Sequence, residues 1–437
     1  MSTRAPRPAP GHFSASDGSP RSEPGRLVGG ACGSASGSRL PAAVEALARP
    51  LGAAVPVSMA DLTTLRVGGP LGTYVEATTE AELVDAVQGA DAQGAPLLVV
   101  GGGSNILVSD AGFDGVVVRD ARQEIVLTSR DHGEDEVTAT AGTTWDDLVR
   151  QAVASGWYGF APLSGIPGTV GAAPVQNIGA YGAEVADLLT CVRVWDRLEG
   201  RVEIRTLASL RLAYRDSDLK RSLTDEDVGG GRTWGPTGRW VVLSVTLLAR
   251  HADLEAPVAY GQLATALGVA LGARAPAREV REAVLGLRRS KGMVLDRSDH
   301  DTWSAGSFFT NPVLTRQEAR ALPDEAPRYP AVTDRLGGEA GPGTGHTGQA
   351  RRAARSGDQA CLVKTSAAWL IEHAGFSKGF ALTQDAPARL STRHVLALTN
   401  RGGARAQDLV ALRDAVVSGV RQRFGVTLVP EPVHVGF

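Results

Sequence analysis

Two glycine-rich segments restrict what this chain can fold into. The first, GGGSNILV (101–108), follows the apolar run LLVV (97–100) and ends in the run ILV. The second, LSGIPGTVGAAPVQNIGAYGAEV (163–185), holds five glycines and two prolines among small apolar residues. Ordering so much glycine costs entropy, and a disordered linker would be more polar. We therefore expect the backbone of the second segment to lie against a flat ligand, such as a nucleotide or a flavin ring.

The first segment can be interpreted in two ways from its residues alone. A dinucleotide-binding loop of the G-x-G-x-x-G type joins a strand to a helix, whereas this glycine turn joins two predicted strands. The successive backbone N–H groups of 101–105 would form a nest for a phosphate or diphosphate, with the Ser104 and Asn105 side chains as added donors. A plain tight hairpin between the two strands accounts for the same residues equally well.

Composition excludes several broad classes of function. The 437 residues carry 45 Lys and Arg against 47 Asp and Glu, and the net charge of -2 gives no general attraction to nucleic acid or to membranes. No apolar run approaches the roughly 18 residues that span a bilayer, and the N-terminus lacks the apolar part of a signal peptide. No metal-binding spacing of Cys and His is present. Cys32, Cys191 and Cys361 lie far apart, so we expect a reduced, cytoplasmic compartment.

Composition also divides the chain along its length. Residues 1–45 and 333–360 are rich in small and polar residues, and we predict a disordered extension and a disordered insertion there. Residues 60–252 alternate short apolar runs with turns and helices. Residues 256–428 hold amphipathic helices around a strand, which is typical of a compact α+β module. The end of the chain, 429–437, has the pattern of a strand.

Periodicity and turn residues predict the individual elements. The predicted strands are 73–78, 97–100, 106–108, 201–207 and 394–400. The predicted helices are 80–94, 277–292, 365–375 and 406–425. A capping box of Thr143 or Thr144 with Asp146 or Asp147 marks the start of one more helix.

Several polar residues allow both a structural and a functional interpretation. Tyr214 and Arg215 stand side by side after a predicted strand, where a surface ion pair is the ordinary interpretation. Arg288, Arg289 and Lys291 end a predicted helix. Their charges suit the helix dipole, but they also suit an anion site.

Two further residues lie in unusual local sequences. Ser307 stands in SAGSFFTNP, between glycine and two phenylalanines, where a packed hydroxyl is the simplest interpretation. Glu431 lies between two prolines, which fix the local backbone. A carboxylate held rigidly near the chain end is either structural or directed at a site.

Six motifs occur in a characteristic order over about residues 62–437. They are GGGSNILV, LSGIPGTVGAAPVQNIGAYG, YRDSDLK, AGSFFTNP, AAWLIEHAG and LVPEP. Together they resemble the UDP-N-acetylenolpyruvoylglucosamine reductase family. The resemblance implies an α+β protein with a vanillyl-alcohol-oxidase-type FAD-binding region (60–252) and a smaller substrate-binding domain (256–428). It also implies that the tail 429–437 returns to the active site.

The resemblance implies a reaction and a cofactor. NADPH would reduce noncovalently bound FAD, and flavin N5 would deliver a hydride to the β-carbon of UDP-N-acetylglucosamine enolpyruvate. A proton to the α-carbon would complete UDP-N-acetylmuramate, in peptidoglycan precursor synthesis. An oxidase of a hydroxy acid or sugar alcohol on the same fold is the alternative. A flavin-binding protein without catalytic activity is a third class.

The resemblance also assigns residues. Ser307 would donate the proton, and Arg215 would orient Glu431 near the substrate carboxylate. The substrate-binding positions are Tyr214, Tyr260, Arg288, Lys291 and Asn311. The cofactor-binding positions are Gly101, Gly102, Gly103, Ser104, Asn105, Ile166, Pro167, Gly168, Gly171, Ala172, Gln176, Asn177, Gly179 and Gly182.

Two positions depart from the family pattern. Where an arginine near the flavin is expected after PEP, this chain has Val433 or His434, depending on the alignment. His394 stands where other members have glutamine.

Overall fold

The computed structural model describes residues 56, 58–128, 135–330 and 362–437. The predicted disordered segments 1–45 and 333–360 lie outside these residues, as do Cys32 and Cys361. None of the described helices combines the length and the apolar character that crossing a membrane requires.

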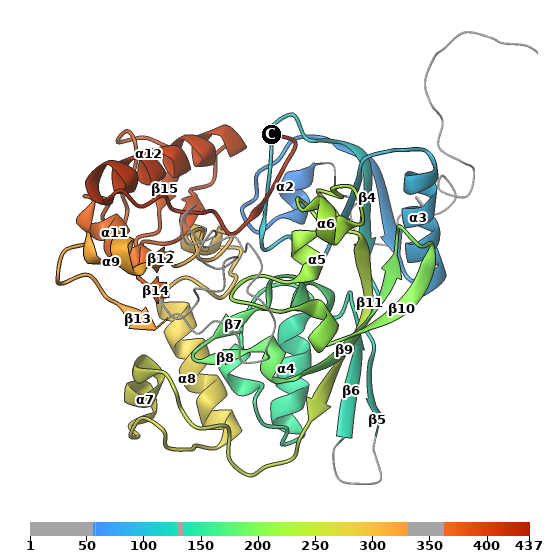
Figure 1. The fold of residues 1–437 in the computed structure, drawn as a ribbon, viewed down its shortest axis with the longest axis horizontal. Helices are drawn as coiled ribbons and strands as arrows, with labels where there is room; N and C mark the ends of the chain where they lie inside the picture. Colours follow the sequence, from blue (N-terminus) through green and yellow to red (C-terminus); the bar gives the residue numbers. More distant parts are fainter. Residues whose placement is uncertain (1–55, 57, 129–134, 331–361) are drawn as a thin grey trace, which may run out of the picture. The chain divides into compact units, whose positions relative to one another are not determined.

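A small parallel sheet opens the described chain. Its strands follow the order β1-β4-β2, and helix α3 packs beside them (Figure 1). Thr79 caps α3 by accepting the Glu82 backbone N–H, and the Glu82 carboxylate bonds back to the cap. The elements here are α2 (Met59–Leu62), β1 (Leu71–Ala77), α3 (Glu80–Ala92), β2 (Leu97–Val100), β3 (Ile106–Val108) and β4 (Phe113–Asp120). The predicted strands and helix in this region are confirmed.

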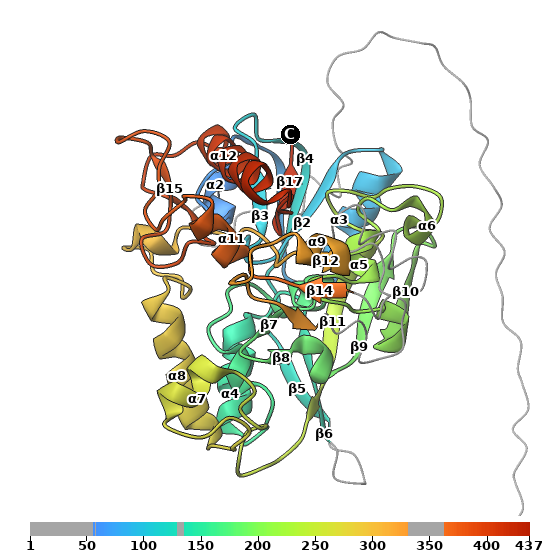
Figure 2. The ribbon, with the colours of Figure 1, turned by 60° about the vertical axis from the view of Figure 1, so that its left-hand side comes forward.

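The glycine turn does not form a hairpin. β2 pairs with β4, whereas β3 pairs in parallel with β17 (Val433–Val435) at the chain end. Val433 lies opposite Ile106, and Figure 2 shows the two strands together. The hairpin interpretation is therefore wrong, and the turn is a crossing between two sheets.

A five-stranded antiparallel sheet follows, in the order β10-β9-β11-β6-β5. Its strands are β5 (Ile125–Thr128), β6 (Asp135–Thr140), β9 (Leu189–Asp196), β10 (Arg201–Thr206) and β11 (Trp240–Ala249). Helix α4 (Trp145–Ala154) has Thr144 at its N-cap, but no side-chain cap forms. The predicted capping box is wrong because the Thr143 hydroxyl bonds that of Thr140 at 2.9 Å, and Asp146 pairs with Arg281 at 2.8 Å.

The second glycine-rich segment folds into short turns rather than long elements. They are η1 (Ala161–Leu163), η2 (Val170–Ala172), η3 (Pro174–Gln176), β7 (Gly179–Ala180), β8 (Ala183–Glu184) and η4 (Val185–Asp187). Next come η5 (Ala208–Leu210), α5 (Asp218–Arg221) and α6 (Glu226–Gly229). Repeated short turns expose main chain along one side of the segment, which is what a backbone-lined site needs.

The rest of the chain is mostly helical with short strands. The helices are α7 (Gly261–Leu267), α8 (Ala277–Ser290), η6 (His300–Thr302), α9 (Arg316–Arg320), α11 (Ala367–His373) and α12 (Ala406–Phe424). The strands are β12 (Val313–Thr315), β13 (Tyr329–Pro330), β14 (Leu362–Lys364), β15 (Ala388–Leu390) and β16 (Leu398–Asn400). The three predicted helices that correspond to α8, α11 and α12 are confirmed.

Two of the hydrophobic cores among the described residues join elements from both sides of the predicted domain division. One joins the five-stranded sheet and α4 to Leu263 of α7 and to Val280 and Val284 of α8. The other joins α11 and α12 to Leu65 and Leu107 from the start of the chain. Both cores thus contain residues from either side of the predicted division near residue 252.

Candidate active site

A cavity of about 370 Å³ lies between the glycine turn, the second glycine-rich segment and the chain end. Most of the predicted cofactor-binding residues line it: Gly101, Gly102, Gly103, Ser104, Asn105, Ile166, Pro167, Gly168, Gly171, Ala172, Gln176 and Gly179. Asn177 and Gly182 are outside the lining. The Asn177 amide instead donates to Glu184 at 3.0 Å and to the Ala213 carbonyl at 3.1 Å, so it holds neighbouring turns together.

The glycine turn is packed too tightly for any other residue. Gly103 has φ +58, and a Cβ built there would lie 1.7 Å from the Leu62 carbonyl oxygen. A Cβ on Gly102 would lie 2.7 Å from the Gly168 Cα, so the two glycine-rich segments touch main chain to main chain. Within the described residues, the backbone N–H groups of 102–105 make no hydrogen bond. Such free, clustered donors fit a phosphate or diphosphate.

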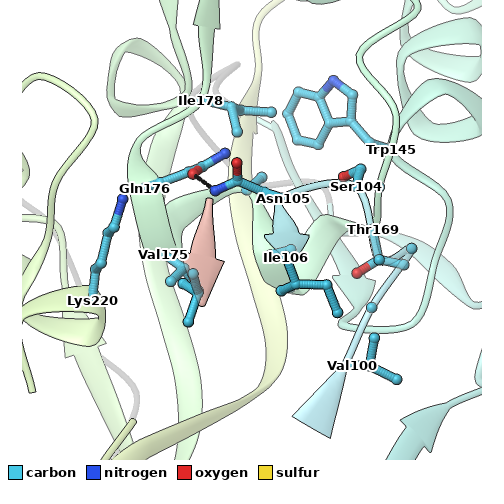
Figure 3. A pocket seen from close by; sticks show the side chains of 18 of the residues that line it. Val100, Ser104, Asn105, Ile106, Trp145, Thr169, Val175, Gln176, Ile178 and Lys220 are labelled. Atoms are coloured by element: carbon cyan, nitrogen blue, oxygen red, sulfur yellow. Dashed lines mark hydrogen bonds between the residues drawn. The ribbon is translucent and has the colours of Figure 1, made fainter. Parts of the chain in front are cut away.

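The two polar side chains of the turn are engaged within the protein. The Ser104 hydroxyl donates to the Pro167 carbonyl at 3.0 Å. The Asn105 amide donates to the Gln176 side chain and to the Glu431 carbonyl, the latter at 3.4 Å (Figure 3). In this arrangement the donors available to an anion are the backbone groups rather than these side chains.

Apolar side chains form another part of the cavity wall. Val100, Ile106, Trp145, Val175 and Ile178 surround the polar residues in Figure 3. The Trp145 indole N–H is satisfied by the Leu163 carbonyl at 3.0 Å, so this ring presents only carbon to the cavity. Backbone donors at one place and apolar surface at another match the diphosphate and the ring system of a flavin dinucleotide.

Ser307, Arg215 and Glu431 come from distant parts of the chain and line this same cavity. The Arg215 Nε lies 3.5 Å from the Glu431 carboxylate, and its other nitrogens donate to the Asn177 and Gly179 carbonyls at 3.2 and 2.7 Å. The Glu431 backbone N–H donates to the Phe308 carbonyl at 2.8 Å. This bond fixes the rigid chain end beside the residue that follows Ser307.

The Ser307 hydroxyl has a histidine partner. Its Oγ lies 3.3 Å from His394 Nε2. Burial lowers the pKa of His394 to about 4, and three nearby cations, Lys291, Lys378 and Arg288, act in the same direction. The imidazole is therefore uncharged at neutral pH. The side chains of Phe308 and Phe309, which follow Ser307, are fully buried in the second hydrophobic core.

The cations at the end of α8 form a group that is suited to binding an anion. Arg288 lines the cavity, and burial lowers its pKa to about 10. Lys291 donates to the Gln262 side chain at 2.7 Å, and burial and Arg288 lower its pKa. Tyr181 and the partly exposed Tyr260 meet edge to face at 5.5 Å, with Lys291 5.9 Å from the Tyr181 ring. A depressed pKa on several neighbouring cations means that binding an anion would relieve their repulsion.

A second cationic group lies beside Arg215, outside the cavity lining. Lys364 Nζ lies 3.5 Å from the centre of the Tyr214 ring, and burial and Arg215 lower the pKa of Lys364 to about 8. Asn311 interacts with Tyr214, and its side-chain oxygen accepts the Ala367 backbone N–H at 3.0 Å. The sequence offered no motif around Lys364, so its role there was missed.

The two residues that could replace the expected arginine lie in different places. Val433 lines the cavity, whereas the His434 ring bonds Arg413 at 2.9 Å. Lys220, the last residue of the motif YRDSDLK, was given no role from the sequence and lines the same cavity. The described residues contain no cluster of three or more His, Cys, Asp or Glu that could hold a metal ion.

Comparisons with known proteins agree with this geometry. An FAD binding domain model matches residues 72–204, and a model of the UDP-N-acetylenolpyruvoylglucosamine reductase C-terminal domain matches 298–435. A reductase of that name from Nocardia farcinica is 48% identical over 389 residues, which covers 87% of this chain and 89% of the relative. One from Cutibacterium acnes is 44% identical over 380 residues, with coverage of 87% and 89%.

A solved structure extends the likeness to three dimensions. The crystal structure of UDP-N-acetylenolpyruvylglucosamine reductase from Thermus caldophilus is 25% identical, with a TM-score of 0.51, and covers 87% of this chain and 97% of the other. The fold and the cavity define an FAD-containing oxidoreductase, and the expected fold class is confirmed. More narrowly, the chain belongs to the UDP-N-acetylenolpyruvoylglucosamine reductase family.

Proposed function

We propose that this chain uses NADPH to reduce UDP-N-acetylglucosamine enolpyruvate to UDP-N-acetylmuramate, a step of peptidoglycan precursor synthesis. The observation that carries the proposal is the meeting of Ser307, Arg215 and Glu431 on the cavity of the glycine turn. The names of the relatives, reductases of UDP-N-acetylenolpyruvoylglucosamine, support the choice of substrate.

The bound cofactor and the protein divide the chemistry. When bound along the cavity, FAD would supply the hydride-carrying chemistry between NADPH and the β-carbon of the enolpyruvyl group. The α-carbon is then electron-rich and needs a proton, and its carboxylate needs cations. These two needs fall to the side chains of this chain.

Ser307 supplies the proton in this proposal. The O–H bond of Ser307 breaks as the new C–H bond forms at the α-carbon. An alcohol is a weak acid, so its surroundings must favour the transfer. The buried rings of Phe308 and Phe309 anchor the chain immediately after Ser307 in the second hydrophobic core. In the tautomer that carries its proton on Nε2, the uncharged His394 donates to Oγ across 3.3 Å, and the serine proton is then free to point at the substrate.

Arg215 and Glu431 shape the electrostatics around the reacting carbon. Arg215 is held by two backbone carbonyls and lies 3.5 Å from Glu431. A guanidinium fixed in this way is preorganised to stabilise charge that develops on the substrate carboxylate and the α-carbon. Glu431, fixed by its backbone bond to Phe308, is positioned by Arg215 toward the same place.

The two cationic groups are suited to binding the charged parts of a nucleotide-sugar. Arg288 and Lys291 stand on one side, and Lys364 stands beside Tyr214 on the other. Burial and mutual repulsion depress the pKa values of these cations, and a bound diphosphate and carboxylate would offset both effects. The exposed Tyr260, edge to face with Tyr181, is available to cover the bound nucleotide.

An anaerobic titration in two steps tests the proposal. The purified protein is expected to be yellow, to lose its oxidised flavin spectrum with one equivalent of NADPH, and to regain it when the enolpyruvyl UDP-sugar is added. Release of UDP-N-acetylmuramate is followed by mass spectrometry. Reduced protein that stays bleached with this substrate, but recovers quickly with oxygen, would reject the reductase in favour of an oxidase.

A further inference from the structure

Lys220 is a buried cation to which the proposed reaction assigns no role. It lies in α5, whose N-cap Ser217 accepts the Lys220 backbone N–H at 3.1 Å and donates to the Val175 carbonyl. These bonds fix α5 against the segment that lines the cavity. The residue is only 7% exposed, and its side chain reaches the cavity (Figure 3).

The ammonium group of Lys220 is incompletely paired. Its one hydrogen bond among the described residues goes to the Glu431 backbone carbonyl at 3.3 Å. The two nearest carboxylates already have arginine partners: Asp216 has Arg221 at 2.6 Å, and Glu431 has Arg215 at 3.5 Å. Lys220 is therefore a cation in excess, and keeping such a charge buried is costly unless a bound anion compensates it.

Burial lowers the pKa of Lys220, although Glu431 and Asp216 act in the opposite direction. A lowered pKa agrees with an ammonium group that has no carboxylate of its own among the side chains around it.

The position of Lys220 within the cavity identifies the part of the cofactor it faces. Lys220 and Asn105 donate to the same oxygen, the Glu431 carbonyl, beside the Arg215–Glu431 pair. Of the free N–H groups of 102–105, the glycine end lies instead where the turn meets Gly168, and Asn105 is the end nearer Glu431. The reacting ring of the flavin must be near Ser307 and Glu431, while the diphosphate suits the turn. Lys220 thus belongs to the ring end of the cavity.

We propose that Lys220 stabilises the negative charge that the flavin ring gains on reduction, and that it thereby raises the reduction potential of the bound FAD. A hydride brings two electrons and one proton, so the ring system gains one negative charge. The nearby ammonium provides that charge with a partner that Val433 cannot supply. This inference rests on the FAD cofactor and is independent of the substrate.

The test compares holoenzymes by equilibration of the flavin with a reference dye, in the absence of NADPH and substrate. Lys220→Met removes the charge at nearly constant volume. We expect it to lower the equilibrium constant for flavin reduction at least tenfold, which is about 30 mV for a two-electron couple. Lys220→Arg keeps the charge and is expected to stay near the wild-type potential.

Lys364→Met is the matched control. Lys364 is also a largely buried lysine with a lowered pKa, but it does not line the cavity. Its loss is expected to leave the potential unchanged, and Lys220→Gln replaces the methionine variant if that one does not fold.

Three results would overturn the proposal. They are a wild-type potential in Lys220→Met or Lys220→Gln, an equal fall in Lys364→Met, and loss of FAD from a folded Lys220 variant. The last result would assign Lys220 to holding the diphosphate. Because neither NADPH nor the UDP-sugar is used, failure of the proposed function would not affect this measurement.

Discussion

The two sides of the cavity are built in different ways. The cofactor side consists of two continuous segments, 101–106 and 166–179, whose backbone and small side chains form the wall. The reacting side consists of single side chains, Arg215, Ser307 and Glu431, brought together from distant parts of the chain. The backbone wall works through the space and the N–H groups that it leaves for the cofactor. The side-chain wall works through the charges of Arg215 and Glu431 and the proton of Ser307. Substitutions on the two sides should therefore fail in different ways.

The largest effect is expected on the cofactor side, for Gly103→Ala. A Cβ there meets the Leu62 carbonyl at 1.7 Å, and the φ of +58 adds strain. We expect a loss of about 3 kcal/mol or more in the free energy of unfolding, together with loss of FAD. Flavin content and urea denaturation measure the two effects.

Gly94→Ala is the control for Gly103→Ala. Its φ of +62 is similar, but no atom lies within 4 Å of the added Cβ. It should cost about 1 kcal/mol and keep its FAD. Equal losses in the two variants would show that backbone strain, and not the packing of the turn, makes glycine necessary.

On the reacting side, Arg215→Met removes a fixed cation together with its bonds to the Asn177 and Gly179 carbonyls, but it adds no bulk to the cofactor wall. We expect reoxidation of the reduced flavin by substrate to slow about 10²- to 10³-fold with FAD content unchanged. Arg211→Met is the control, because Arg211 lies near in sequence and pairs with Asp218 at 2.9 Å, but its side chain is 49% exposed. Stopped-flow absorbance follows the rate, and similar rates in the two variants would contradict the role of Arg215.

His394 links the reacting side to pH. Its pKa of about 4 lies below the ordinary 6.5, so the unfolded chain binds the proton that the folded chain rejects. The stability this gives is complete above pH 6.5 and is lost as the pH falls toward 4. Between pH 7 and 5 the wild type should lose about 2 kcal/mol more than His394→Gln. Urea denaturation at both pH values measures this, and parallel losses would show that His394 is protonated in the folded protein.

The smallest effect is expected for Lys291→Met. Lys291 is one cation among several, so its loss should raise KM for the UDP-sugar roughly tenfold and change kcat less. Steady-state kinetics at low salt measures the difference. Lys378→Met, which removes an exposed lysine from the same neighbourhood, should leave KM near the wild-type value. A larger effect on kcat than on KM would give Lys291 a part in the chemical step.

The contrast between continuous segments and single side chains also explains which parts of the fold and the site could be predicted from the sequence. Helices α3, α8, α11 and α12 have apolar residues near helical spacing within their own sequences and were predicted where they lie. The two glycine-rich segments could be recognised because glycine at this density is costly to order unless the backbone itself is needed. The hairpin and the capping box failed because their residues have distant partners, β17 for β3 and Arg281 for Asp146.

On the reacting side, the residues alone left Ser307 and Glu431 ambiguous, and only the ordered motifs of the family suggested a common site. The burial of Lys220 and Lys364 and the hydrogen bond of His394 depend on how separate segments pack. No local pattern encodes such contacts, so the motif YRDSDLK contains Lys220 without revealing its burial, and the sequence could not predict the place of Lys364 or the His394 bond. For the same reason, the sequence could not predict that α7 and α8 pack into the first core.

Ser307 is proposed to give its proton after the hydride has been transferred, and this order can be tested on the two half-reactions of Ser307→Ala. Each half-reaction is measured separately under anaerobic conditions by stopped-flow absorbance of the flavin. We expect NADPH to reduce the variant's flavin at the wild-type rate, while reoxidation by the enolpyruvyl UDP-sugar slows about 10²- to 10⁴-fold. Equal slowing of both half-reactions, or normal reoxidation, would contradict the role of Ser307 as the proton donor.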